Sequence, residues 1–465
     1  MKPFLKSFAS VKPVHLAVTL IVTAVVSLAN PLGLTLSQTM VLAGLLFAVG
    51  SWATGALDRT LTSLLLLLIF LIFGSTDPLA IVGFLWSDVF LLIAVSGLLA
   101  AALGKNRLLR AWLSRLIAGT AKNRVVFYVT PYLLGILLIF LIPQAFARVV
   151  LLAGIYAAVM DTASQAKRER QAVFFYLYVA VTVTYMMFIG GDIVLNYAAV
   201  SFGGEPLIQE LDGWTWLLHM GVPGVIVSLL AAFTVRVLFR KALPAHPSAV
   251  FAAHVRPGKA ESAYSPADRA GLIVMAAVML LWATESLHGI PGWAAALAGV
   301  VILFLLGGLA AGDLKAINPR FLIFLTAAFN IGQVLRGSGV MAALMEKLQV
   351  LIPDGTSVIF LPALVLFTMV LHMFIGSAVA TLSVVLPVLL PLAKAAGIPA
   401  VWLTLMCYIT VNLHFLMPFH HATMMIGAAN GQFTDRHLIR YGLVMTVGVF
   451  AVIFGLYLPW WRLIS

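Results

Sequence analysis

Apolar segments of about 20 residues recur along the whole sequence, and this is the length that an α-helix needs to cross a bilayer. Hydropathy predicts spans near residues 14–30, 37–56, 61–74, 87–103, 172–202, 215–240, 270–286, 293–310, 321–335, 400–429 and 439–461. Hydrophobic residues make up 62% of the chain and charged residues only 9%, against about 25% charged in soluble domains. We therefore expect the whole chain to be membrane domain.

Two further apolar regions, residues 125–160 and 356–395, have the length of helical hairpins. We expect each to enter and leave the membrane on the same side. The predicted fold class is an all-α polytopic membrane protein with about 11 transmembrane helices and two re-entrant helical hairpins.

An internal repeat supports this organisation. The tripeptide Trp52–Thr54 recurs as Trp282–Thr284, and each half then contains a hairpin region followed by a long span broken by glycine or proline. An odd number of crossings separates the halves, so the two copies have opposite orientations, as in many secondary transporters. The predicted units are an amino-terminal span (1–34), a first inverted repeat (35–240), a cytoplasmic linker (241–269) and a second inverted repeat (270–465).

The net charge of +12 lies mainly in loops, which argues for membrane topology and against nucleic-acid binding. Basic residues gather in 105–124, 167–170 and 236–269, and the positive-inside rule makes these loops cytoplasmic. The amino terminus, with Lys2, Lys6 and Lys12, is then cytoplasmic and the carboxyl terminus outside. For so compact a chain we expect the bacterial inner membrane, with the lipid bilayer as a partner.

Two segments resemble a known family. LLWATESLHGIP (Leu280–Pro291) and FLMPFHHATMMIGAANGQFTDRHLIRYG (Phe415–Gly442) are similar to motifs of the divalent-anion/sodium symporters, which carry dicarboxylates, citrate or sulfate. The resemblance implies a small anionic substrate and a homodimer. It also implies a fixed scaffold domain, a mobile transport domain that moves as an elevator, and a site built from two hairpin tips and two helix breaks.

The chain departs from the family at those positions. Family hairpin tips typically carry Ser-Asn-Thr, whereas here the tips are Pro143–Arg148 and Gly376–Thr381, and the second break has His421–Met424 in place of Thr-Pro-Pro-Asn. Sodium needs several hard oxygen ligands that converge on one point. Because those ligands are largely missing, we expect no cofactor and no obligatory sodium coupling.

Arg148 is the most informative candidate, because an arginine inside an apolar segment cannot easily reach water. A charge at membrane depth costs about 2.5 kcal/mol or more and normally faces a cavity or a partner. Its guanidinium could pair with an anionic substrate in place of a mobile cation. The alternatives are a contact with lipid headgroups or a pair with Asp192, which is itself either a proton acceptor or unremarkable.

Polar residues at the other interruptions complete the predicted site. Hydroxyls at helix amino ends can bind an anion together with backbone donors, and histidine can take up a proton near neutral pH. The predicted substrate-binding residues are Gln144, Arg148, Gly190, Gly191, Asn196, Ser377, Thr381, His420, His421 and Thr423. The candidates for proton coupling are Asp192, His420 and His421, and no metal ligand is predicted.

These features predict a secondary active transporter of a small anion, such as a di- or tricarboxylate, and not an enzyme. It would work as an elevator, coupled to protons or as an exchanger. One alternative is an ordinary sodium-coupled dicarboxylate or sulfate symporter that uses backbone carbonyls with Ser377, Thr381 and Thr423. Another is a membrane-embedded metal hydrolase that uses His414, His420 and His421. A third is a non-transporting receptor with the same fold.

Overall fold

The computed structural model describes residues 12–160, 167–245, 265–351, 357–417 and 420–464, and every regular element in these ranges is a helix. The predicted all-α class is thereby confirmed. The first half contains α2 (Pro13–Ala29), α3 (Leu36–Thr54), α4 (Arg59–Phe73), α5 (Pro78–Gly83), η2 (Phe84–Trp86), α6 (Asp88–Lys105), α7 (Arg107–Gly119), η3 (Thr120–Lys122), α8 (Arg124–Leu137), η4 (Leu138–Phe140), α9 (Ala145–Val159), α10 (Lys167–Thr184), η5 (Tyr185–Met187), η6 (Ile189–Asp192), α11 (Ile193–Phe202), α12 (Glu205–Glu210) and α13 (Gly213–Leu238).

The second half repeats much of this order. It contains α14 (Pro266–Ala283), α15 (Glu285–His288), α16 (Gly292–Leu305), η9 (Ala311–Ala316), α17 (Pro319–Gly337), α18 (Val340–Leu351), α19 (Phe360–Ile375), α20 (Ala378–Ala395), α21 (Ala400–Leu413), α22 (Ala422–Ala429), α23 (Asp435–Val452), η11 (Ile453–Tyr457) and α24 (Leu458–Ile464). Each predicted hairpin region thus holds two helices joined by a short turn, α8 with α9 and α19 with α20. Membrane insertion of these pairs, the count of eleven spans and the repeat boundaries remain predictions. Most of the predicted linker lies outside the described residues.

Helix lengths show which of the predicted spans could cross a membrane as one helix. Among the described residues, four helical stretches are long and apolar enough to cross a membrane: Pro78–Lys105, Gly213–Leu238, Ala378–Ala395 and Asp435–Ile464. A fifth is obtained if the pair Ala311–Gly337 and Val340–Lys347, which is bent by 76°, counts as one span. Other apolar helices have only 10–17 residues. Two of them, Arg124–Phe140 and Ala145–Val159, are the two halves of the predicted region 125–160.

Local sequence explains where the interruptions fall. Pro143 has no backbone N–H and disfavours helical geometry in the residue before it, so the chain cannot continue as a helix from η4 into α9. At the second hairpin, Gly376 adopts the left-handed conformation (φ 66°) and ends α19, while Ser377 caps the start of α20. The turns therefore lie where proline and glycine place them.

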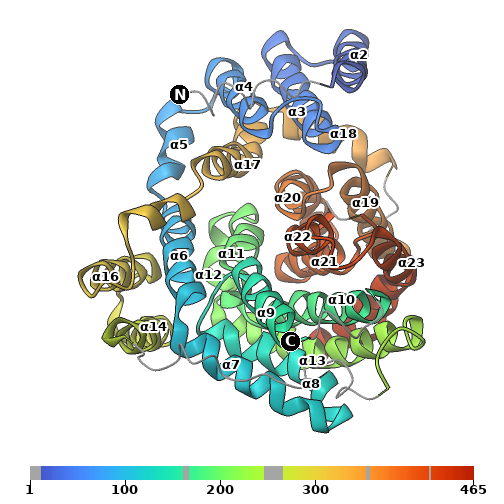
Figure 1. Ribbon diagram of the computed structural model, residues 1–465. Helices are drawn as coiled ribbons and strands as arrows, with labels where there is room; N and C mark the ends of the chain where they lie inside the picture. The colour runs from blue at the N-terminus through green and yellow to red at the C-terminus, as the bar shows by residue number, and fades with distance from the viewer. Residues whose placement is uncertain (1–11, 161–166, 246–264, 352–356, 418–419, 465) are drawn as a thin grey trace.

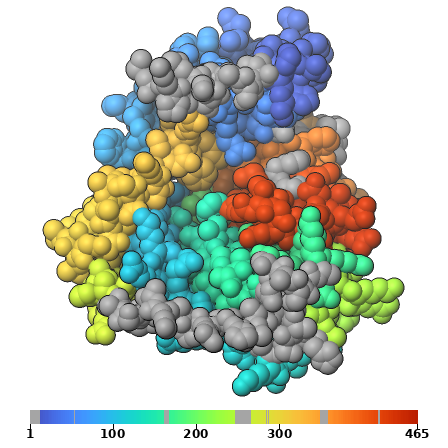
Figure 2. All heavy atoms as spheres, viewed as in Figure 1, coloured from blue at the N-terminus to red at the C-terminus, as the bar shows by residue number. Residues whose placement is uncertain are grey.

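The interrupted helices lie in the interior of the molecule. Figure 1 shows α9, α11, α20, α21 and α22 near the centre, with α2, α3 and α4 at one edge and α14 and α16 at another. In α10, every residue from Ala172 to Thr184 is buried, and this helix packs against α8, α13 and α22. The space-filling view of the same face shows the red carboxyl-terminal segment next to the green middle of the chain (Figure 2). Segments far apart in sequence thus form one core.

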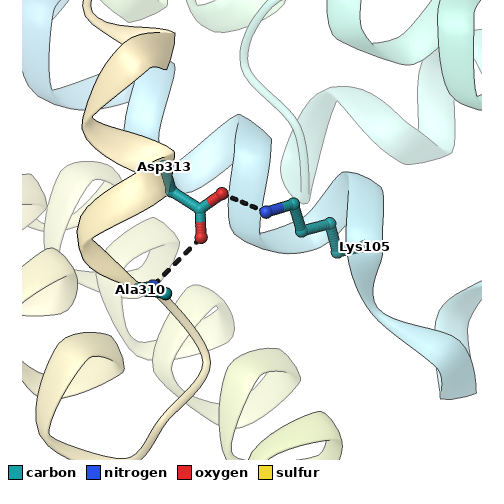
Figure 3. Close-up of polar contacts among 3 residues, drawn as sticks. All are labelled: Lys105, Ala310 and Asp313. Atoms are coloured by element: carbon teal, nitrogen blue, oxygen red, sulfur yellow. Dashed lines mark hydrogen bonds and ion pairs between the residues drawn. The ribbon is translucent and has the colours of Figure 1, made fainter.

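A polar clasp joins three elements at the end of α6. The ammonium group of Lys105 donates a hydrogen bond to the Asp313 carboxylate in η9, which also accepts from the N–H of Ala310 (Figure 3). The next residue, Asn106, donates to the carbonyl of Asp268 at 2.7 Å, at the start of α14. Because the Lys105 side chain and the Ala310 N–H donate to it, the pKa of Asp313 lies below its usual range. The clasp connects the first half of the chain with the second.

Candidate functional site

Four helices begin at interruptions inside apolar segments. The residues that precede them are Gln144 before α9, Asp192 before α11, Ser377 before α20 and His421 before α22, and each has an extended backbone. The first N–H groups of a helix have no partner within the helix, and its amino end carries a partial positive charge. Each interruption therefore presents backbone donors suited to an anion.

The four helix starts are connected to one another. The N–H of Ile193, at the start of α11, donates to the carbonyl of Pro143 in the first hairpin turn, with 3.1 Å between nitrogen and oxygen. Helix α11 packs against α20, and α9 packs against α22. The central grouping of these helices is visible in Figure 1. The hairpin turns and the helix breaks thus form one region.

Arg148 lies in the first turn of α9 and is completely buried. Its Nη1 donates to the carbonyl of Ile142 at 2.6 Å, and its Nη2 donates to the carbonyl of Gly191 at 2.5 Å. Its Nε has no hydrogen-bond partner in the described part of the chain. The guanidinium therefore joins the first hairpin turn to the first helix break, and its Nε is left without a partner among the described residues.

The first break packs too tightly for side chains at one of its two glycines. A Cβ at Gly191 would lie 2.0 Å from the carbonyl oxygen of Tyr185, whereas a Cβ at Gly190 would have nothing within 4 Å. Asp192 follows directly and accepts a hydrogen bond from the N–H of Val194 at 3.2 Å. Among the described residues, no ion pair joins Asp192 to Arg148, although the carboxylate is near enough to interact electrostatically with the guanidinium.

Asn196 holds the same break in place. Its Nδ2 donates to the carbonyls of Phe188 and Ile189 at 3.0 and 3.1 Å, and its Oδ1 accepts from the Tyr408 hydroxyl at 2.7 Å. Because these bonds use both amide hydrogens, this side chain is suited to positioning the backbone of the break.

A chain of hydrogen bonds connects the first break with the second. Tyr185 donates its hydroxyl hydrogen to Oδ1 of Asn412, so its oxygen must accept from Nε2 of His421, which lies 2.9 Å away. In the neutral ring Nδ1 is then an acceptor, and the Thr423 hydroxyl, 2.8 Å from it, is the donor. Thr423 in turn lies 3.0 Å from the Thr182 hydroxyl. The network assigns His421 one tautomer and occupies both of its ring nitrogens.

The second hairpin and the second break each contribute one histidine to a pair. The buried rings of His372 and His420 have centroids 5.4 Å apart. Nδ1 of His372 lies 3.0 Å from the Thr381 hydroxyl, which donates to the carbonyl of Ser377. Nε2 of His372 is buried and has no partner among the described residues. This nitrogen is a group at which a proton could bind.

The histidines do not assemble as metal ligands in the described part of the chain. No group of three or more His, Cys, Asp or Glu there could hold a metal ion. His414 instead bonds to Thr446 at 3.2 Å through Nε2, and His420 accepts from the N–H of Leu416 through Nδ1.

The predicted residues lie at the interruptions, but several of them use their polar groups in hydrogen bonds within the protein. Gln144, for example, donates to the Ser96 hydroxyl at 3.1 Å. Sequence reasoning missed four residues that bind these groups, namely Thr182, Tyr185, Tyr408 and Asn412. The available signal was weak: polar side chains inside apolar segments close to a predicted break.

Three comparisons place these features among known proteins. A family model described as "Sodium:sulfate symporter transmembrane region" matches residues 10–465. A relative from Cupriavidus necator, described as "Membrane protein", is 24% identical over 470 residues, which cover 94% of this chain and 90% of the relative. The crystal structure of the Alcanivorax borkumensis YdaH transporter aligns with a TM-score of 0.51 and 18% identity, over 84% of this chain and 87% of that chain. At this identity the likeness shows a shared fold.

Proposed function

Because the chain belongs to the sodium:sulfate symporter family and is therefore a multi-pass membrane transporter, we propose that it carries a small dianion or carboxylate-bearing metabolite without a strict requirement for sodium. The family predicted from Leu280–Pro291 and Phe415–Gly442 is thereby confirmed. The substrate class, the coupling and the elevator motion go beyond family membership and are argued below.

One observation carries the proposal: four helix amino ends are connected, through the Ile193–Pro143 hydrogen bond and the packing of α11 on α20 and of α9 on α22, in a region that also contains a buried arginine. Each amino end carries a partial positive charge, and transporters with interrupted helices direct such ends at anionic substrate groups. Arg148 adds a full charge, and its Nε donor is still unpaired among the described residues. The region is therefore electrostatically suited to an anion.

The position of the guanidinium supports independence from sodium. A sodium ion would be held by oxygen ligands such as backbone carbonyls. Arg148 already binds two of these, the carbonyl of Ile142 at the first hairpin turn and the carbonyl of Gly191 in the first helix break. A fixed cation thus fills the place where a mobile cation would have ligands. The charge needed to attract a dianion is then permanent.

Protons are the coupling ion that the second hairpin favours. His372 has one unpartnered buried nitrogen within the described residues and lies beside His420. Histidine changes its charge near neutral pH when its environment permits. His421, by contrast, has both ring nitrogens engaged, so its role in this proposal is to position the second break. Asp192 remains a second proton-coupling candidate.

Uptake into proteoliposomes tests the proposal. Purified protein should accumulate a labelled dianion from a panel of dicarboxylates, citrate and sulfate when a proton gradient is imposed, or exchange it against internal anion, with sodium replaced by choline. Strict dependence on a sodium gradient would disprove the coupling scheme. Failure of every anion in both uptake and exchange would disprove the substrate class and favour the receptor alternative.

Two other functions receive less support. A sodium-driven symporter would use the hydroxyls of Thr381 and Thr423, but these already bond to His372 and His421. A metal hydrolase would need His414, His420 and His421 to converge, whereas in the described structure each bonds to different partners.

The assembly and membrane location belong to the same proposal. We expect a homodimer in the bacterial inner membrane with a cytoplasmic amino terminus, in which a scaffold domain stays fixed while the interrupted helices move. Cross-linking in native membranes tests the dimer. Cysteine accessibility from each side, using variants of the Cys407→Ser protein, tests the topology.

A further inference from the structure

A cavity of about 900 Å³ lies away from the interrupted helices, between the start of α10, the end of α13 and the start of α23. Five cationic side chains line it: Arg168, Arg240, Lys241, Arg436 and Arg440. Among the described residues of the lining Asp435 is the one carboxylate, which gives these residues a net charge of +4 with His437 neutral. This concentration of charge comes from three segments that are distant in sequence.

None of the five cations has a partner in the described part of the chain. All are exposed, and the ion pairs found there involve other residues, such as Lys105 with Asp313. Exposed basic residues on a protein surface are common when they are scattered. Here five unpaired cations face one hollow, where their mutual repulsion is relieved only by a bound anion or by solvent and salt.

One side of the cavity is formed by a packed histidine. His437 is largely buried and stacks on Phe239, with ring centroids 4.9 Å apart and an interplanar angle of 30°. Its Nδ1 lies 2.9 Å from the hydroxyl of Thr434, the residue that precedes α23. The amino end of this long helix therefore adds its partial positive charge to the same place.

Apolar surface continues from the cavity along two helices. Val237, which lines the cavity, is half exposed, and Phe233, one turn earlier on the same face of α13, is 65% exposed. On α23, Leu443 lies three residues after Arg440 and is 60% exposed. A ligand with a charged head and apolar tails matches this arrangement, because tails could lie along α13 and α23 while the head occupies the cavity.

We propose that this cavity binds a phosphate-bearing anion, and that its occupant in the membrane is the headgroup of an anionic phospholipid. Arginine pairs with phosphate oxygens through two parallel hydrogen bonds. Basic pockets between membrane helices on the cytoplasmic side suit lipid phosphates, and the positive-inside rule places this end of α10, α13 and α23 on that side. The site is separate from the one proposed for the transported anion.

Native mass spectrometry of delipidated protein tests the site. We expect cardiolipin or phosphatidylglycerol to bind and phosphatidylcholine not to bind. The variant Arg436→Gln/Arg440→Gln should weaken the binding of anionic lipid by about thirtyfold, or about fivefold for each arginine removed from contact with the headgroup. The control Lys122→Gln/Arg124→Gln removes the same charge from exposed positions outside the cavity and should change affinity little.

The remaining outcomes also decide the question. The proposal would be overturned if phosphatidylcholine bound as tightly as the anionic lipids, or if both double variants lost the same affinity for anionic lipid. Binding of inorganic pyrophosphate to the wild type, lost in Arg436→Gln/Arg440→Gln, without any binding of anionic lipid would support phosphate recognition and overturn the lipid as its source. Because Arg436 and Arg440 are exposed and have no partner among the described residues, the double variant should fold normally. A thermal unfolding curve without added lipid checks this. If that curve shifts, the same comparison is made with Arg436→Gln alone.

Discussion

Nη2 of Arg148 donates to the carbonyl oxygen of Gly191 at 2.5 Å, so a cation fixed in the first turn of α9 is held by the backbone of the first helix break. With the carbonyl of Ile142 on Nη1, the guanidinium has the kind of neighbours that a bound metal cation would have. This relationship is the basis for expecting sodium to be dispensable.

Replacing Arg148 with alanine should make the protein responsive to sodium. The variant loses two charge-assisted hydrogen bonds, at about 1.5–3 kcal/mol each, so uptake should fall about tenfold or more. It also frees two carbonyls, and sodium chloride should then raise its melting temperature more than choline chloride does. The wild type should show no such difference, and Arg148→Lys should be intermediate. If the alanine variant folds and its melting temperature does not respond to sodium, the Arg148 guanidinium does not take the place of a sodium ion.

The two adjacent glycines of the first break should respond differently to alanine. A methyl group at position 191 would overlap the Tyr185 carbonyl, so Gly191→Ala should destabilise the protein by about 1–3 kcal/mol and reduce transport. Position 190 has open space, and Gly190→Ala should change stability by less than about 0.5 kcal/mol. Thermal unfolding in detergent measures both. Similar losses in the two variants would show that the break is not packed as described.

The Tyr185 hydroxyl should matter more than other buried tyrosine hydroxyls. Tyr185→Phe leaves Asn412 Oδ1 and His421 Nε2 without their shared partner, which costs about 1–3 kcal/mol and should loosen the second break. Tyr457→Phe is the matched control, because its hydroxyl is buried without a partner among the described residues. Melting temperatures and initial uptake rates check the pair; an equal response of both variants would refute the network.

Sequence reasoning located the interruptions but not the contacts made there. Proline, paired glycines and the length of apolar segments are local signals, so the breaks near Pro143, Gly191 and Gly376 could be predicted. The direction of the Arg148 side chain depends on tertiary packing, and the bond between Tyr185 and Asn412 joins positions 227 residues apart. A single sequence carries no signal for such pairings.

The Lys105–Asp313 clasp should contribute stability that depends on pH. Lys105 and the Ala310 N–H lower the pKa of Asp313, so the contribution is complete above the unfolded value of about 3.9 and is lost as pH falls through the lower folded value. Because Lys105 is exposed, we expect about 0.2–1 kcal/mol, reduced by salt. A double-mutant cycle with Lys105→Met and Asp313→Asn measures it, and a coupling that persists below both pKa values would exclude this origin.

His372 should separate coupled transport from exchange. If its unpartnered nitrogen binds the coupling proton, His372→Gln removes proton-driven accumulation but leaves exchange of internal for external anion, since exchange needs no net proton movement. Glutamine retains a polar group near Thr381, which limits the structural damage. His288→Gln, at the exposed end of α15, should leave both activities unchanged. Equal loss of accumulation and exchange would instead assign His372 to the support of the second hairpin, because a purely structural defect reduces every mode of transport together.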